Sequence, residues 1–356
     1  MAIHQSNLFR RITCARVLGA AVSTVALLAS AGIAHAQGRT GDARAFYAQK
    51  TVKFIVGYAP GGGYDIYARM LQPHLAKELG ATVIVENQPG AGSLTALNQL
   101  YASEPNGLQI MIVNGTAAGS AQLISQSAVR YDLAKMGHLG LISTQPWIWL
   151  AAPNAPYNNL AEALAHKARI RWAATGLIDS MSDGASIMCE ALKLDCQIIM
   201  GYKGSNEAAL SVFRGETDSI YISDTSGNNY IKAGQAKPIV TMSREKSRFF
   251  PTLPTIFESM KLTAEQEEWF ALRASLDALG RILVTAPNVP ADRLAFLQES
   301  VKNILNDPAL IADGERTQRY IEYQSAETTR QMAVDAISSL SPERKKRVSD
   351  VMTRSN

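Results

Sequence analysis

VKFIVGYAPGGGYD, residues 52–65, combines a buried strand, a glycine turn and the start of a helix. Phe54, Ile55 and Val56 are aromatic or β-branched, as expected of a buried strand, and Pro60 ends the strand. The three glycines that follow lack a Cβ atom, so their backbone N–H groups can approach a ligand closely. A helix is predicted over residues 65–79, and free amides at a helix N-terminus bind anions and carbonyl oxygens. The stretch therefore predicts either a ligand-binding loop or a tight turn that binds nothing.

The N-terminus has the three parts of a secretory signal peptide. Three arginines lie between positions 10 and 16, residues 17–33 are apolar and small, and the AHA sequence at 34–36 fits a cleavage site. A membrane anchor is the alternative, but the apolar run is short and rich in alanine. We expect residues 1–36 to be cleaved and the mature protein to be periplasmic.

The mature chain is nearly neutral. The signal segment contains three of the 35 basic residues and none of the 31 acidic ones, so the mature net charge is +1. Proteins that bind nucleic acids or anionic membranes need a basic excess or a basic stripe, and neither partner is expected here. The 320 residues after the cleavage site are enough for two domains, and we expect a monomer.

Two cysteines, Cys189 and Cys196, remain after cleavage. On one continuous helix their Cα atoms would be about 10 Å apart, too far for a disulfide, so pairing requires the helix to break near Leu194. An oxidising compartment permits the bond, and the sequence leaves the pairing open. The three histidines of the mature chain are scattered and no Cys-x-x-Cys occurs, so neither a metal site nor a cofactor is expected.

Short apolar strands alternate with helical segments in two groups, which predicts an α/β protein with two lobes. The first group has strands at 52–56, 82–86 and 109–113. The second has strands at 147–151, 171–174, 197–200, 219–222 and 238–242. A strand at 281–285 is predicted to return to the first lobe, so lobe 1 comprises residues 37–144 plus 244–356 and lobe 2 comprises residues 145–243. Several strands end in polar or glycine-rich turns, which right-handed crossovers bring to one ligand-binding edge of a sheet.

Four motifs, in this order, carry a resemblance to a known family: APGGGYD at 59–65, ENQPGAGS at 86–93, GYKGS at 201–205 and FPTLPT at 250–255. Together with the signal peptide, they make the chain similar to the substrate-binding receptors of tripartite tricarboxylate transporters, the Bug-type family. Over residues 265–290 the sequence resembles a divergent branch of this family. The resemblance implies a type II periplasmic-binding fold, in which two lobes joined by crossing strands close around a small carboxylate. It also implies delivery of the ligand to integral-membrane transporter subunits.

The same resemblance implies a set of ligand-binding residues on both sides of the cleft. From lobe 1 these are Tyr58, Ala59, Gly61, Gly62, Gly63, Tyr64, Asp65, Gly90, Asn114, Gly115 and Thr116. From lobe 2 they are Trp147, Thr175, Gly176, Ser180, Lys203, Gly204, Ser205 and Asp224. Asp65 and Asp224 also suit helix capping, and Lys203 and Trp147 also suit a solvated loop and the core, respectively.

The sequence departs from the common family pattern at two places. Tyr64 occupies a position where threonine or serine is frequent, and the loop at 177–181 has fewer glycines and serines than usual. Both changes make the cleft bulkier and more apolar. We therefore expect a monocarboxylate with an apolar or aromatic body, an interpretation that Trp147 also supports.

The sequence also bears on three other classes of function. A secreted hydrolase could use Ser180, Ser205 or Ser223, but no Gly-x-Ser-x-Gly motif occurs and few histidines are available as a base. A phosphate-binding P-loop lacks its Gly-Lys-Ser/Thr ending. A ligand sensor that signals to a membrane kinase has the same sequence features as a transport receptor, and that alternative stays open.

Overall fold

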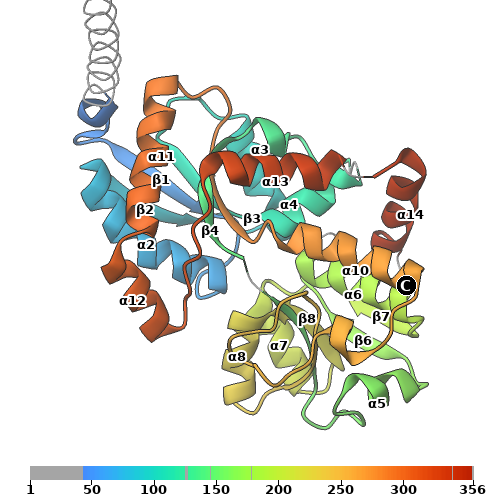
Figure 1. Ribbon diagram of the computed structural model, residues 1–356. Coiled ribbons are helices and arrows are strands. Elements are labelled where there is room, and N and C mark those ends of the chain that lie inside the picture. The colour runs from blue at the N-terminus through green and yellow to red at the C-terminus, as the bar shows by residue number, and fades with distance from the viewer. Residues whose placement is uncertain (1–42, 125–126, 145, 178, 339, 355–356) are drawn as a thin grey trace, which may run out of the picture.

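The computed structural model describes residues 43–124, 127–144, 146–177, 179–338 and 340–354. The predicted signal peptide, residues 1–36, and position 178 of the loop at 177–181 lie outside the described residues. Two five-stranded sheets, each packed against helices, form two lobes (Figure 1). This architecture confirms the predicted α/β fold of the type II periplasmic-binding class.

The first sheet has the strand order β2-β1-β3-β10-β4. β1 is parallel to β2 and β3, whereas β10 is antiparallel to both of its neighbours. The strand bounds are β1 Thr51–Val56, β2 Thr82–Asn87, β3 Gln109–Asn114, β4 Gly137–Ser143 and β10 Arg281–Thr285.

The second half of β1, residues 54–56, is buried on both faces, which explains its continuous apolar sequence, whereas Thr51 and Lys53 are exposed. Phe54 and Val56 point into a core that also contains residues of α2 and α11, while Ile55 belongs to the core on the opposite face. The helices of this lobe are α2 Gly63–Leu79, α3 Leu94–Tyr101, α4 Gly115–Leu123, α11 Ala291–Leu305, α12 Pro308–Thr317 and α13 Ala326–Ser338, with short 3₁₀ helices at Ala91–Ser93 and Leu133–Lys135.

The second sheet repeats the plan of the first, with the order β7-β6-β8-β5-β9. β6 is parallel to β7 and β8, and β5 is antiparallel to β8 and β9. Its strands are β5 Trp147–Ala151, β6 Ile170–Ala173, β7 Cys196–Ile199, β8 Ser219–Ser223 and β9 Lys237–Thr241. Its helices are α5 Leu160–Ala165, α6 Ser180–Leu192, α7 Ser205–Phe213 and α8 Asp224–Lys232.

The chain crosses between the sheets twice, after β4 and again between β9 and β10. The second crossing contains α9 Ile256–Ser259 and α10 Ala264–Asp277. α10 packs against α4 of the first lobe and α6 of the second, and α14 Pro342–Met352 also packs against α6 (Figure 1). α10 and α14 belong to the residues predicted to form lobe 1, yet both pack against α6 of lobe 2. The predicted bounds of the two lobes therefore stay a proposal. None of the described helices is long and apolar enough to cross a bilayer.

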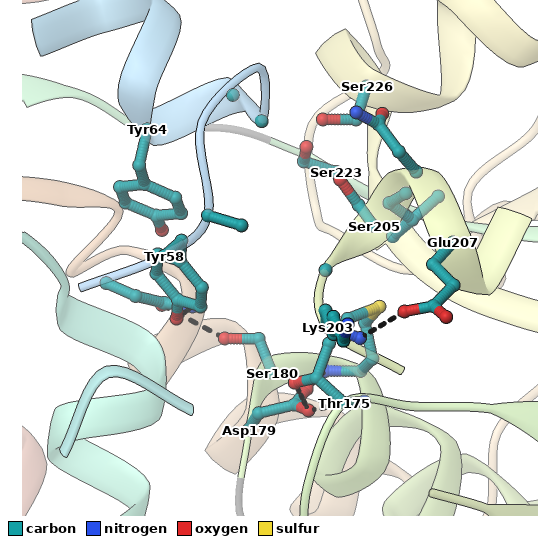
Figure 2. Close-up of a pocket in the computed structure, with 18 of the residues that line it drawn as sticks. Tyr58, Tyr64, Thr175, Asp179, Ser180, Lys203, Ser205, Glu207, Ser223 and Ser226 are labelled. Atoms are coloured by element: carbon teal, nitrogen blue, oxygen red, sulfur yellow. Dashed lines mark hydrogen bonds between the residues drawn. The ribbon is translucent and has the colours of Figure 1, made fainter. Parts of the chain in front are cut away.

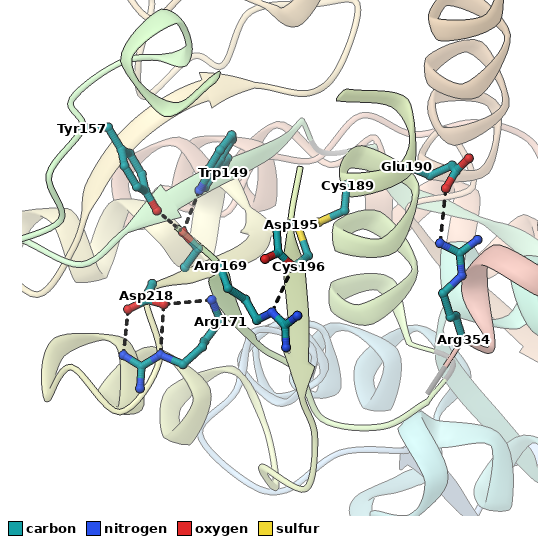
Figure 3. The surroundings of a disulfide bond; sticks show 11 residues. Trp149, Tyr157, Arg169, Arg171, Cys189, Glu190, Asp195, Cys196, Asp218 and Arg354 are labelled. Carbon is teal, nitrogen blue, oxygen red and sulfur yellow. Dashed lines mark hydrogen bonds and ion pairs between the residues drawn. A yellow bond between two sulfur atoms is a disulfide. The ribbon is translucent and has the colours of Figure 1, made fainter. Parts of the chain in front are cut away.

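Cys189 and Cys196 form a disulfide that joins the end of α6 to the start of β7 (Figure 3). α6 ends at Leu192, and Lys193 adopts a left-handed conformation with φ of 54°. This turn shortens the Cα–Cα distance between the cysteines to 6.3 Å, within the range of a disulfide. The helix break that pairing requires is therefore present.

Candidate functional site

A cavity of about 170 Å³ lies between the two lobes (Figure 2). Five helices begin at its wall, namely α2 and α4 from one lobe and α6, α7 and α8 from the other. Each of these helices follows a strand of its sheet, directly or after a short loop, as expected at the ligand-binding edge of an α/β sheet. The cavity therefore faces several helix N-termini, which carry positive partial charge.

The first wall is the glycine loop between β1 and α2. Gly62 is the N-cap of α2, and no side chain caps this helix, so its first amides lack the acceptor that a capping residue would supply. Tyr58 and Tyr64 flank the loop, with their rings stacked at 5.0 Å between centroids. A Cβ atom at Gly63 would lie 3.4 Å from Ser226 Oγ of α8, so glycine lets the second lobe approach closely.

The opposite wall begins with Asp179, which caps α6. Its carboxylate accepts hydrogen bonds from the backbone N–H groups of Thr175 and Gly176, both at 2.9 Å, and it forms a capping box with Ser182. The neighbouring Ser180 donates from Oγ to Asn114 Oδ1 at 3.0 Å, a contact between the lobes (Figure 2). Asp179 therefore fixes the loop at the cavity, and its carboxylate is hydrogen-bonded by donors of its own lobe.

The third wall is the loop before α7. Glu207 accepts a hydrogen bond from the backbone N–H of Lys203 at 2.7 Å, and the Lys203 side chain is exposed at the mouth. Asn206 donates from Nδ2 to the Gly61 carbonyl at 3.4 Å, a second contact between the lobes. Like Asp179, Glu207 is engaged by its own loop.

Apolar and aromatic groups complete the lining. Trp147 is 5% exposed and stacks on Tyr221 at 5.2 Å between ring centroids, and Met181 and Ile222 also line the cavity. Tyr64 Oη and Trp147 Nε1 are buried and have no hydrogen-bond partner among the described residues. Buried donors of this kind usually find an acceptor.

Arg281, the first residue of β10, lines the cavity although it is only 1% exposed. Its Nη1 donates to Ser143 Oγ at 3.3 Å. Its guanidinium carbon lies 4.4 Å from the ring centroid of Tyr67 and 5.3 Å from that of Tyr64. Burial raises the pKa of Tyr64, and the charge of Arg281 opposes this shift, so the phenol is neutral at physiological pH.

A buried ionic cluster lies behind the cavity. Arg273 of α10 pairs with Asp277 at 2.8 Å and lies 3.7 Å from Asp183 of α6, and its Nη2 donates to the Ser180 carbonyl. Burial raises the pKa of Asp183 to about 8 and that of Asp277 to about 6, against the opposing effect of Arg273. The cluster joins α10 to the helix that presents Ser180.

Twelve of the nineteen predicted site residues line the cavity. They are Tyr58, Ala59, Gly62, Gly63, Tyr64, Asn114, Trp147, Thr175, Ser180, Lys203, Gly204 and Ser205. Their roles in ligand binding stay predictions.

Seven predicted residues do not line the cavity, and for two of them, Asp65 and Asp224, helix capping was the alternative role. Asp65 is inside the first turn of α2 and does not cap it, because its carboxylate accepts from the Gly61 N–H at 2.9 Å and pairs with Arg69. Asp224 is buried and accepts from Ser247 Oγ at 2.7 Å.

The other five predicted residues lie in α4 or in loops and do not line the cavity. Gly115 and Thr116 were expected in a turn but are buried inside α4, where a Cβ atom at Gly115 would lie 2.6 Å from the Leu279 carbonyl oxygen. Gly90 has φ of 159° in the loop before the first 3₁₀ helix. Gly61 and Gly176 direct their N–H groups at Asp65 and Asp179 instead of at the cavity.

The sequence analysis missed nine cavity residues. They are Pro60, Asp179, Met181, Asn206, Glu207, Ile222, Ser223, Ser226 and Arg281. All but Ile222 and Arg281 lie beside predicted site residues or within the first turn of a helix that starts at the cavity, and Ile222 is next to the last residue of β8, so a wider window around each strand end would have found these eight. Arg281 has a different signal: it is the one charged residue in the mainly apolar strand at 281–285 that was predicted to return to the first lobe.

Comparison with known proteins identifies the family. Residues 67–336 match the tripartite tricarboxylate transporter family receptor profile. A UPF0065 protein of Bordetella pertussis is 27% identical over 284 residues, which cover 78% of this chain and 85% of the relative. Protein BugT of the same organism is 24% identical over 243 residues, covering 67% of this chain and 74% of BugT.

Solved structures show the same fold. The periplasmic binding protein BugD superposes with a TM-score of 0.71 at 21% identity, covering 86% of this chain and 99% of BugD. MatC of Rhodopseudomonas palustris, solved with bound malate, gives a TM-score of 0.67 at 20% identity, with 85% and 99% coverage.

Proposed function

The chain belongs to the tripartite tricarboxylate transporter receptor family, and we propose that it is an extracytoplasmic receptor that captures a small organic acid. The observation that carries the proposal is the convergence of five helix N-termini on one cavity between the lobes. Such a site favours an anion, because N–H groups and helix dipoles point at it together. The two acidic side chains in the wall, Asp179 and Glu207, accept hydrogen bonds from their own loops and leave this preference intact.

The lining favours a monocarboxylate with an apolar or aromatic body. Tyr58, Tyr64, Trp147, Met181 and Ile222 supply most of the apolar surface, and the free hydroxyl and indole N–H groups supply additional donors. The malate bound to MatC shows that this fold can hold a dicarboxylate. The bulk of Tyr64 is the reason to expect a ligand with one carboxylate here.

Capture is proposed to work by closure of the lobes. The ligand docks on the glycine loop, the second lobe swings onto it and excludes water, and membrane transporter subunits recognise the closed form. The contacts of Ser180 with Asn114 and of Asn206 with Gly61 span the two lobes and would form or tighten in that movement.

Isothermal titration calorimetry of the mature chain, from Gln37 onward, tests the proposal. Benzoate, phenylacetate and hexanoate are expected to bind more tightly than malate, succinate or citrate. Binding of citrate or succinate without binding of the monocarboxylates would contradict the ligand class, and binding of none of these acids would contradict the receptor function. NMR of the recovered acid separates a receptor from an enzyme, because a receptor returns its ligand unchanged.

Delivery to a transporter and the periplasmic location complete the proposal. Cell fractionation is expected to find the mature chain in the periplasm, with residues 1–36 removed. Deletion of the gene is expected to abolish uptake of the bound acid. If the protein is instead a sensor for a membrane kinase, the deletion changes transcription, and uptake by an expressed transporter stays intact.

A further inference from the structure

Two arginines of the described residues are buried equally, and of this pair only Arg273 has a carboxylate partner there. Arg273 and Arg281 are both 1% exposed. Arg273 pairs with Asp277 at 2.8 Å and lies 3.7 Å from Asp183. Arg281 has no carboxylate of a described residue within 4 Å; its hydrogen bond to Ser143 Oγ is long, at 3.3 Å, and its Nε has no partner there.

The groups in direct contact with Arg281 do not neutralise it, and the carboxylate that attracts it through space, Asp224, forms no ion pair with it. A Cβ atom at Gly63 would lie 3.6 Å from Arg281 Nη2, so the guanidinium lies beside the first residue of α2, at the positive end of that helix. Tyr64 and Tyr67 offer ring faces, which attract a cation but carry no net charge. The buried Asp224 is engaged by Ser247 Oγ at 2.7 Å and by the N–H of Thr225.

A buried guanidinium without a carboxylate in direct contact is costly, and the carboxylate of a ligand would lower that cost. We propose that Arg281 pairs with the carboxylate of the ligand at the α2 end of the cavity, an inference that rests on the proposed receptor function. The planar fork of arginine matches a carboxylate in a two-point hydrogen bond, and the free amides at the start of α2 complete the acid site. The body of the ligand then extends over Tyr58, Tyr64 and Trp147, and a neutral amide of the same shape is rejected.

Four variants separate this role from a structural one. Arg281→Met removes the charge and keeps an unbranched apolar stem, and Arg281→Lys keeps the charge and removes the fork. Arg273→Met is the matched buried control, because it leaves Asp183 and Asp277 without their cation. Arg330→Met, an exposed substitution on α13, controls for the change in net charge.

The experiment measures binding of benzoate, phenylacetate and hexanoate, each beside its neutral amide, and the melting temperature of each unliganded variant. Arg281→Met is expected to melt at or above the wild-type temperature, since it removes an unpaired charge, whereas Arg273→Met melts well below it. The affinity of Arg281→Met for the acid is expected to fall at least about 30-fold. The affinity of Arg281→Lys is expected to lie between those of wild type and Arg281→Met. The preference for acid over amide is expected to disappear in Arg281→Met and to persist in Arg330→Met.

Two results would overturn the inference and leave the receptor function intact. In the first, Arg281→Met binds the acid within about 3-fold of wild type. In the second, Arg281→Met destabilises the unliganded protein as strongly as Arg273→Met does, which makes Arg281 a structural residue. If the wild-type protein binds none of the acids, the receptor proposal fails and this inference fails with it.

Discussion

Tyr64 contributes both a buried ring and a buried hydroxyl to the cavity wall. Replacing it with threonine, the residue type frequent in the family, removes the ring that stacks on Tyr58 and opens space beside Gly63. We expect Tyr64→Thr to weaken benzoate binding about tenfold, since the lost apolar contact is worth roughly 1–2 kcal/mol, and to improve binding of malate. Calorimetry with both acids measures the change. Tyr64→Phe is the control, and unchanged selectivity in Tyr64→Thr would show that Tyr64 does not select the ligand.

The raised pKa of Asp183 predicts that the stability of the folded protein depends on pH. Burial raises its pKa from 3.8 to about 8, so between these values the folded chain keeps a proton that the unfolded chain has lost. The free energy of unfolding therefore falls as the pH rises through this window, by at most about 1.4 kcal/mol per pH unit. Asparagine cannot ionise, and we expect the stability of Asp183→Asn relative to wild type to increase between pH 5 and pH 8.

Urea unfolding at several pH values tests this prediction. Asp335→Asn, which alters an exposed carboxylate on α13, is the control and should parallel the wild type. A constant difference between Asp183→Asn and wild type would show that Asp183 is already ionised and paired with Arg273 throughout the range.

The disulfide stabilises the junction of two elements, α6 and β7. It closes a loop with a sequence separation of 7, for which loss of unfolded-state entropy predicts about 2–3 kcal/mol of stabilisation. We expect the double variant Cys189→Ser with Cys196→Ser to unfold at lower urea concentration by this amount. Reductant should destabilise the wild type equally and leave the double variant unchanged. Equal stability of the two oxidised proteins would contradict the expectation.

Most strands could be predicted from the sequence, because each has its own β-branched and aromatic run and a polar turn after it. β5 and β10 match the predicted bounds, and the other predicted strands differ by one residue at one end or at both ends. β4 was missed, because glycines at 137 and 140 and a histidine at 138 interrupt its pattern. α4 was missed because its small residues are buried almost all round and show no helical period.

The candidate site was predictable to the extent that it follows strand ends. Residues after β1, β6 and β7 line the cavity as a local rule would place them. Arg281 depends instead on the return of the chain from the second lobe, because only the antiparallel pairing of β10 with β3 brings it beside Asn114 and the glycine loop. A contact made across more than 160 residues has no signature in a local window.

At the scale of the whole molecule, contacts outside the cavity also join the lobes. Gln318 ends α12, which packs on α11 of the first lobe, and its Oε1 accepts from Asn228 at 3.0 Å and from Lys232 at 2.8 Å, both in α8 of the second. Because Gln318 does not line the cavity, it can affect affinity only through the position of the lobes.

Gln318→Ala is therefore expected to favour the open form without touching the ligand. We predict a 3- to 10-fold loss of affinity for benzoate, equal to about 0.7–1.4 kcal/mol, carried mainly by faster dissociation. Small-angle scattering should show that the unliganded variant is more extended than wild type and that excess ligand compacts both to the same dimensions. Gln331→Ala, on the exposed side of α13, is the control. If Gln318→Ala binds and compacts as the wild type does, this contact plays no part in closure, and the pairs Ser180–Asn114 and Asn206–Gly61 hold the lobes together.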